Sequence, residues 1–319
     1  MNKIYKKMKE NIEKHNPLFV IFIVIRAYSF HFLNLIFNFK LEKIKFYKEL
    51  GYQLNLENPK SFNEKIIWKK INDRNPLLPV NADKYEVRSY IKEVLGEERA
   101  KEILIPLYFV TEQPAAIPFK NLPSAFIIKP NHTSGKSIII ENGPVDQNEI
   151  IKTCGRWLKT PYGLEKLEWA YQPIKRKIVI EKLLRNKDGS NPMELKFHIF
   201  HGKCKLVFLI LDKQNNPFRS YYDKYWNYLP VKKITRPRGL KIEKPKNYEV
   251  MLELAEILSK PFDYVRIDFY NIKEKIYLGE FTHYPGSGTT KFEPQNFDFE
   301  LGKHWNVEKE YWKKNKKLE

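Results

Sequence analysis

Cysteine is scarce in this sequence. Cys154 and Cys204 are the only two cysteines in 319 residues, and they lie far apart. Structural zinc sites need closely spaced cysteine or histidine ligands, and disulfide frameworks need several cysteines. The scarcity therefore argues against both, and it favours a reducing compartment.

Acidic residues are in the minority. The chain has 38 Asp+Glu against 57 Lys+Arg, which gives a formal net charge of +19. A basic surface attracts anions, so nucleotides, nucleic acids, acidic polysaccharides and membrane surfaces are all candidate partners. Charge alone does not choose among these classes.

Low-complexity segments and internal repeats are absent from the sequence. Hydrophobic residues make up 42% of it and aromatic residues 14%, which is too much apolar surface for a solvated coil. A chain of this length forms one large core or two to three lobes. We therefore expect a folded protein.

The N-terminal segment combines a basic stretch with a long apolar run. Residues 17–39 are long enough to span a bilayer, but Arg26 and His31 lie inside the run, and such groups are costly in hydrocarbon. No small-residue cleavage site follows, which argues against a secretory signal peptide. The run is then a helix packed on the protein or an interfacial helix on an anionic leaflet, with a true span as the third choice. The lysines before it favour contact with the cytoplasmic face.

Hydrophobic periodicity predicts an α+β fold in which helices alternate with hairpins. Ser61 and Glu64 have the spacing of a capping box, which predicts a helix start. The predicted helical segments are 41–75, 81–102, 147–170 and 247–260. The predicted strands are 103–110, 177–184, a strand, turn and strand at 124–140, and two adjoining strands at 194–211.

Two acids each end an apolar run within residues 265–288. Arg266 lies two residues before the first acid, Asp268, and Thr282 lies two residues after the second, Glu280. Side chains two apart on a strand share a face, and the turn-like NIKEK between the runs predicts a hairpin that brings both pairs together. Three oxygen ligands beside a guanidinium suit phosphate chemistry with bound Mg²⁺.

Two further segments carry charged residues at strand ends. In FIIKPNHTSGKS, Lys129 precedes a turn of small polar residues with Gly135, and lysine beside backbone N–H groups suits phosphate oxygens. The turn lacks Walker A spacing, so an ordinary hairpin turn with a solvated lysine is the alternative. Glu181 ends the strand KIVIEKLL, where it could accept from the adenine amino group or simply face water. Glu194 and Lys196 share a strand face, where the alternative is a surface ion pair.

These segments occur in the order found in the ATP-grasp superfamily. DKYEVRSYI, FIIKPNHTSG, ELKFHIFHGK and LGEFTHYPGSG resemble the TupA-like ATP-grasp amidoligases, which are associated with bacterial cell-surface polymers. The resemblance extends from about Gly51 to Gly302. It implies an ATP-grasp fold, in which two α+β lobes grip ATP. The implied divisions are a basic and apolar helical extension at 1–50, an N-terminal lobe at 51–125, a central lobe with the phosphate loop at 126–185, and a C-terminal lobe with the metal hairpin at 186–319.

The resemblance also implies roles for single residues. It implies that Lys129 and Lys84 contact the phosphates of ATP. It also implies that one turn forms a lid over the γ-phosphate, the turn that contains His132, Thr133, Ser134 and Gly135. The implied adenine contacts are Glu181, Lys182 and Leu183. The implied ribose contact is Glu194, with Lys196 beside it. The residues implied to bind two Mg²⁺ ions are Asp268, Glu280 and Thr282. Many superfamily members have asparagine where this chain has Thr282, and a threonine hydroxyl is a weaker ligand.

The implied reaction begins with attack of a substrate carboxylate on the γ-phosphate of ATP. An amine then attacks the resulting acyl phosphate, while Arg266 and the backbone of residues 285–288 hold the oxyanion. His283 could accept the amine's proton, although a lone histidine is more often structural. We expect an acidic surface glycan or its uronic-acid precursor as the carboxylate, and an amine or amino acid as the second substrate. The basic and aromatic stretch 219–233, with Arg219 and Trp226, is the predicted acceptor side.

Three other classes fit parts of this pattern. A polysaccharide glycosyltransferase would bind a nucleotide sugar without turning over ATP. A kinase would share the first half-reaction without needing an amine. A nucleic-acid binder would explain the charge but would leave Asp268 and Glu280 without a role, so we expect no nucleic-acid partner. We expect a cytoplasmic protein. Residues 1–40 are the candidate segment for peripheral contact with the inner face of the cytoplasmic membrane.

Overall fold

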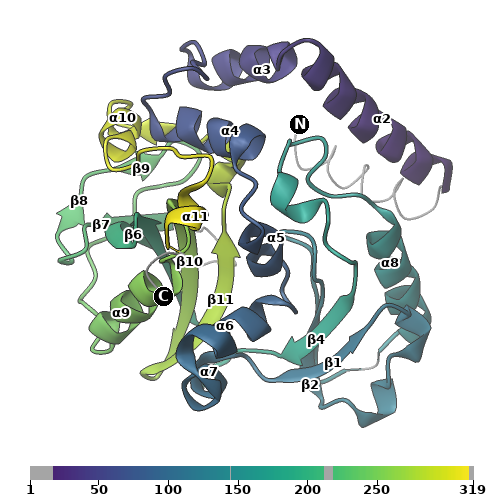
Figure 1. Ribbon diagram of the computed structural model, residues 1–319. Helices are drawn as coiled ribbons and strands as arrows, with labels where there is room; N and C mark the ends of the chain where they lie inside the picture. The colour runs from purple at the N-terminus through teal and green to yellow at the C-terminus, as the bar shows by residue number, and fades with distance from the viewer. Residues whose placement is uncertain (1–16, 144, 212–217, 316–319) are drawn as a thin grey trace. The chain divides into compact units, whose positions relative to one another are not determined.

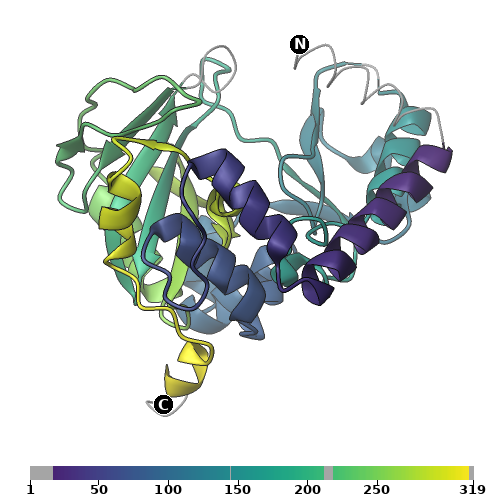
Figure 2. The ribbon, with the colours of Figure 1, turned by 90° about the horizontal axis from the view of Figure 1, so that it is seen from above.

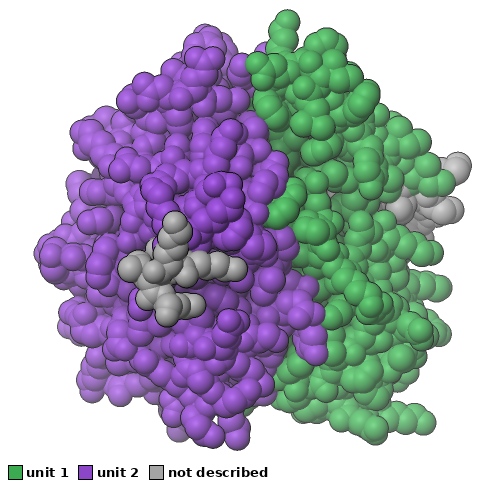
Figure 3. Space-filling view, in the orientation of Figure 1, with its two compact units in different colours: residues 1–42, 107–183 green, residues 43–106, 184–319 purple. Residues whose placement is uncertain are grey.

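A computed structural model of the protein describes residues 17–315 except 144 and 212–217. The chain divides into two compact units, and each unit combines two separate stretches of sequence (Figure 3). Unit 1 contains residues 1–42 and 107–183, and unit 2 contains residues 43–106 and 184–319. The four predicted divisions of the chain stay a prediction.

Unit 1 is built on a four-stranded antiparallel sheet with the strand order β1-β4-β2-β3. Its strands are β1(Leu107–Thr111), β2(Ala125–Pro130), β3(Ile138–Glu141) and β4(Ile178–Lys182). Helix α8(Gln147–Lys159) packs on this sheet, and Ile150 and Cys154 from the helix meet Ile128 and Ile180 in a shared apolar core. The predicted strand, turn and strand at 124–140 is confirmed.

Unit 1 also contains α2(Pro17–Ile36), the continuous purple helix in Figure 2. Over the part of the chain that the structure describes, no single helix is long and apolar enough to cross a membrane. Ile21–Ile36 and Lys40–Leu50 together pass that test by length and composition, but they are bent by 101°. The segment Lys40–Leu50 is helix α3, which spans the boundary between the units.

Unit 2 contains a six-stranded antiparallel sheet with the order β11-β10-β5-β6-β7-β8 (Figure 1). Its strands are β5(Met193–Phe200), β6(Lys203–Leu211), β7(Phe218–Tyr222), β8(Tyr228–Leu229), β10(Tyr264–Ile272) and β11(Lys275–Thr282). A separate pair is formed by β9(Lys232–Lys233) and β12(Phe292–Glu293). The helices of this unit are α4(Phe62–Asn72), α5(Leu77–Ala82), α6(Val87–Leu95), α7(Glu97–Ile103), α9(Tyr248–Leu258), α10(Phe297–Gly302) and α11(Tyr311–Asn315).

The two faces of the large sheet differ in character. Phe197 of β5 stacks on Tyr248 of α9 with 5.8 Å between ring centroids, so α9 covers this face. Lys196 and His198 are neighbours of Phe197 along the strand and therefore point to the opposite face. That opposite face carries the charged residues of the candidate site. The mixture of helices and antiparallel sheets confirms the predicted α+β class.

One predicted helix is broken and another ends earlier than its periodicity suggested. The segment 81–102 is broken, because Gly96 adopts a φ of +80° between α6 and α7, a conformation that glycine tolerates. The predicted helix 147–170 ends at Lys159, because Thr160 precedes a proline and such residues disfavour the helical conformation. The predicted strand 103–110 correspondingly begins at Leu107.

Candidate functional site

The hairpin of β10 and β11 brings together the four side chains that sequence placed in pairs. Arg266 is the cross-strand partner of Thr282, and Asp268 is the partner of Glu280. Arg266 donates to both Asp268 oxygens at 2.7 Å, to Glu280 Oε1 at 3.2 Å and to Thr282 Oγ1 at 2.9 Å. Thr282 in turn donates to Glu280 Oε1 at 3.1 Å. The predicted hairpin is confirmed, and one guanidinium bridges its two strands.

Strand β5 adds a second cation to this cluster. Lys196 lies opposite Asp268 in the antiparallel pairing of β5 with β10, and its ammonium bonds to Asp268 Oδ2. The same ammonium donates to Glu194 Oε1 at 2.8 Å. Glu194 and Lys196 are buried, so the alternative of a surface ion pair is wrong. Sequence did not reveal the link between Lys196 and Asp268, because local patterns do not encode which strands are neighbours.

These contacts set the charges of the cluster. Burial alone would raise the pKa of Asp268, but Arg266 and Lys196 outweigh it and hold this pKa below the usual range. Burial opposes the charged form of Arg266, yet the Asp268 and Glu280 carboxylates raise the pKa of its guanidinium. Asp268 and Arg266 therefore stay charged at neutral pH. The side chain of Glu280 is 35% exposed, so it is the accessible acid of the pair.

The residues predicted to hold magnesium have suitable chemistry. Two carboxylates and a hydroxyl from Asp268, Glu280 and Thr282 are hard oxygen donors on one sheet face, which is the ligand type that Mg²⁺ prefers. Among the described residues, no three or more His, Cys, Asp or Glu side chains are placed together to hold a metal ion. The protein therefore supplies at most part of a coordination shell here. That is typical of Mg²⁺ sites, where phosphates and waters supply the remainder.

Unit 1 holds the residues predicted to contact adenine, and it holds Lys129, one of the two lysines predicted to contact phosphate. Lys129 of β2 and Glu181 of β4 form an ion pair at 3.0 Å, and both side chains are largely buried. The alternatives of a solvated lysine and a water-facing acid are therefore wrong. After Glu181, Lys182 is exposed and Leu183 is half-buried.

The turn after Lys129 has a buried base and an exposed tip. His132 and Thr133 are buried, whereas Ser134 and Gly135 are exposed. Asn131 anchors the base, because its side chain donates to the carbonyl of Lys175 and accepts from the amide of Lys177. Gly135 has a φ of +76°, which favours glycine at the tip. Lys84 belongs to unit 2, where it is half-buried between α5 and α6.

His283 follows β11 and is buried. Its ring lies 5.2 Å from that of Phe262, and neither ring nitrogen has a hydrogen-bond partner among the described residues. Burial, followed by the nearby charge of Lys69, holds the pKa of His283 well below its usual value. The ring is therefore neutral at pH 7. This environment favours a packing role over the predicted role as proton acceptor.

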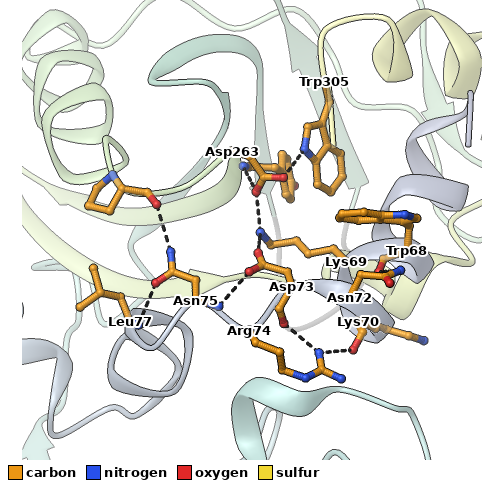
Figure 4. A network of polar contacts seen from close by, with 12 residues as sticks. Trp68, Lys69, Lys70, Asn72, Asp73, Arg74, Asn75, Leu77, Asp263 and Trp305 are labelled. Atoms are coloured by element: carbon orange, nitrogen blue, oxygen red, sulfur yellow. Dashed lines mark hydrogen bonds and ion pairs between the residues drawn. The ribbon is translucent and has the colours of Figure 1, made fainter. Parts of the chain in front are cut away.

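A second buried charge network supports the start of β10 and was not foreseen from sequence (Figure 4). Lys69 of α4 is fully buried between the carboxylates of Asp73 and Asp263, with 2.6 Å to Asp263 Oδ1. The indole of Trp305 donates to Asp263 Oδ2 at 2.8 Å. Asp263 directly precedes β10, so these contacts join α4 and the C-terminal segment to the strand that carries Arg266.

The predicted acceptor stretch 219–233 needs one correction. Trp226 is only 8% exposed, stacks on Tyr222 with 4.2 Å between ring centroids, and donates to the carbonyl of Ile242. It is part of the core and cannot stack on a substrate sugar. The exposed aromatic residue of the stretch is Tyr225.

The chain is similar to one protein family and to several solved structures. The family model described as TupA-like ATPgrasp matches residues 64–306. The D-alanine–D-alanine ligase of Bacillus anthracis complexed with ATP is 17% identical with a TM-score of 0.37, over 64% of this chain and 54% of the ligase. The Helicobacter pylori enzyme of the same name is 15% identical with a TM-score of 0.43, over 78% and 68%. The chain thus spans about half the length of the Bacillus anthracis ligase. No curated protein sequence matches the chain.

Proposed function

The chain belongs to the TupA-like ATP-grasp family, and we propose that it is an ATP-dependent ligase that joins a carboxylate to an amine. The observation that carries this proposal is the buried cluster of Arg266, Lys196 and Asp268 with the accessible Glu280 beside it. Such a cluster offers both a metal-type carboxylate pair and a fixed guanidinium. Those are the groups that activation of a carboxylate by ATP requires.

Different residues of the chain have different roles in the proposed reaction. Lys129 and the exposed tip of the 131–136 turn would bind phosphate oxygens, and Glu181 with the backbone of Lys182 and Leu183 would bind adenine. Two Mg²⁺ ions held by Asp268, Glu280 and Thr282 would neutralise phosphate charge. Arg266 stays cationic and would orient the carboxylate and stabilise the oxyanion formed when the amine attacks, worth about 3 kcal/mol for one well-placed donor.

The proposed carboxylate is a uronic acid of an acidic surface glycan or of its precursor. The net charge of +19 and the basic stretch 219–233 support an acidic substrate. The proposed second substrate is an amine or amino acid. ATP with Mg²⁺ is the proposed cofactor set.

We further propose that α2 rests on the inner face of the cytoplasmic membrane. Six of its large apolar side chains are more than half exposed: Ile21, Phe22, Ile25, Phe32, Leu35 and Ile36. Exposed apolar surface beside basic residues is typical of interfacial helices on anionic lipid. Lys40 is exposed at the start of α3, after a short turn that follows α2, and the lysines of residues 1–16 lie outside the described residues.

Vesicle flotation tests this location. The protein should float with vesicles of anionic phosphatidylglycerol and not with phosphatidylcholine, and the double substitution Ile25→Glu and Phe32→Glu should abolish flotation. Leu240→Glu is the control, because Leu240 is an apolar residue of unit 2 that is even more exposed than Ile25 and Phe32. Unchanged flotation of the α2 variant would reject the membrane contact.

ADP release with Mg-ATP tests the ligase. The purified protein is mixed with a matrix of uronic acids and amines, with Glu280→Gln as the inactive control. Release that needs both a carboxylate and an amine supports the proposal. Release with a single hydroxyl substrate and no amine would instead identify a kinase, and turnover of a nucleotide sugar without ATP would identify a glycosyltransferase.

A further inference from the structure

A second group of cations lies on the same sheet face as Arg266. The register of β5, β6 and β7 places Phe208 beside Lys196, and Arg219 one step along the same face. The guanidinium of Arg219 lies 5.0 Å from the centre of the Phe208 ring, and that of Arg266 lies 5.9 Å from the same centre. Two arginines therefore share one aromatic ring, which fixes both guanidinium groups.

Lys233 extends this group from the short strand β9. Its neighbour Lys232 forms an ion pair with Glu293 at 2.9 Å. Consecutive strand residues point to opposite sides, so Lys233 points away from that pair. Strand β9 packs beside β7, the strand that carries Arg219. Burial lowers the pKa of Lys233, and the charges of Arg219, Arg236 and Arg266 lower it further.

The charges of this group are unbalanced. Arg266 is neutralised by Asp268 and Glu280. In contrast, no carboxylate in the described ranges forms an ion pair with Arg219 or Lys233. Like charges held together and partly out of water are costly, and an anionic ligand would remove that cost.

An open pocket adjoins the same group. It has a volume of 690 Å³, which lies within the range of ligand sites, and Lys232, Arg236 and Arg238 contribute its basic lining. Arg236 lines the pocket, and its backbone amide donates to the carbonyl of Lys233 at 2.8 Å. The pocket offers room for a sugar or carrier group beside the cations.

We propose that Arg219 and Lys233 bind a second oxyanion of the carboxylate substrate, so that the substrate carries an anionic group besides the carboxylate that reacts at Arg266. The inference rests on the proposed function, because that function identifies Arg266 as the place of the reacting carboxylate. The second oxyanion is the phosphate of a glycosyl phosphate or the carboxylate of a neighbouring uronic acid. An isolated uronic acid would leave Arg219 and Lys233 without a counter-ion.

Calorimetric titration of the full chain with three probes tests this inference. The probes are the methyl glycoside of glucuronic acid, glucuronic acid 1-phosphate and a diuronate. We expect at least one doubly anionic probe to bind at least tenfold more tightly than the glycoside. Arg219→Gln and Lys233→Gln should each remove that preference. Lys203→Gln is the control, because Lys203 belongs to the same sheet as Arg219 but is exposed and paired with Glu256, and it should keep the preference.

The outcomes separate this inference from the ligase itself. Equal affinity for the three probes, or no binding of any, would overturn it, as would a preference that survives in both variants. Loss of ATP affinity in the two variants without a change for the probes would assign these cations to ATP and overturn it too. Binding needs no turnover, so a failed ADP-release matrix with an intact probe preference would reject the ligase alone. Unchanged thermal midpoints would show that the variants are folded.

Discussion

Asp268 and Glu280 are cross-strand partners, yet their carboxylates lie in different surroundings. Asp268 is fully buried between two cations, whereas Glu280 is 35% exposed. Sequence alone predicts that Asp268→Asn and Glu280→Gln both abolish turnover and both leave the fold intact. The structure corrects this for Asp268. Its substitution leaves Arg266 and Lys196 buried without a full counter-charge.

We therefore expect the two substitutions to separate stability from activity. Both should abolish Mg²⁺-dependent ADP release, but Asp268→Asn should also lower the free energy of unfolding by about 3–5 kcal/mol. Glu280→Gln should change it by less than about 1 kcal/mol. Urea unfolding and ADP release measure the two effects. Near-normal turnover in both variants would reject the metal assignment, and equal stabilities would reject the description of Asp268.

His283 gives a prediction about pH. Its folded-state pKa is well below that of an exposed histidine, so below about pH 6.5 the unfolded chain binds a proton that the folded chain does not. Stability is thus lost as pH falls, by up to about 1.4 kcal/mol per pH unit for this group. His283→Leu should remove that part of the slope between pH 6.5 and 5.5 in urea unfolding. His198 is also buried with a lowered pKa, so part of the slope should remain in the variant.

Turnover of the same variant addresses catalysis. Since the His283 ring is buried and neutral, we expect His283→Leu to keep its ADP-release rate. A large loss of rate with an unchanged thermal midpoint would instead support the role as proton acceptor that sequence suggested.

The pairs on the hairpin were predictable because they depend only on strand alternation and a short turn. Arg266 with Asp268, and Glu280 with Thr282, needed no knowledge of distant chain segments. Lys196 and Phe208 reach the same site through strand pairing between β5, β6 and β10, and strand order is not a local property. Trp226 was misjudged for a related reason, since its stacking partner and the carbonyl it binds come from the surrounding fold.

Helix starts were predicted better than helix ends. The Ser61 and Glu64 capping box is present at the start of α4, with Ser61 Oγ 3.1 Å from the amide nitrogen of Glu64 and Glu64 Oε2 2.9 Å from that of Ser61. A cap is a contact between residues three apart, so spacing alone reveals it. In the segment 81–102, the apolar periodicity continues across Gly96. The periodicity therefore did not reveal that the helix is interrupted there.

The cap of α4 allows a prediction for that helix. Ser61→Ala removes the acceptor for the Glu64 amide inside a buried segment, so it should lower the free energy of unfolding by about 1–2 kcal/mol. Urea unfolding measures the change. Ser89→Ala is the control, because Ser89 is exposed within α6 and caps nothing in the structure. Equal stability of the two variants would show that the cap does not support α4.

The division of the chain into two interleaved units was beyond what local patterns could predict. Unit 2 joins residues 43–106 to residues 184–319, and contacts distant in sequence decide that grouping. The Lys69 network is one of them, because it connects α4 to Asp263 and Trp305 (Figure 4). In the sequence, Lys69 is one of several lysines near Trp68, and nothing nearby distinguishes it from a solvated residue.

Lys69 therefore provides a test of how unit 2 is held together. Lys69→Met keeps the length of the side chain but leaves Asp73 and Asp263 buried without their cation, which should lower the free energy of unfolding by about 3–5 kcal/mol. Lys303→Met should cost less than about 1 kcal/mol, because Lys303 pairs with Glu300 on the surface. Since Asp263 directly precedes the strand that carries Arg266, the Lys69 variant should also lose ADP release at temperatures where the control remains active. A Lys69 variant as stable as the Lys303 variant would mean that the network contributes no net stability to unit 2.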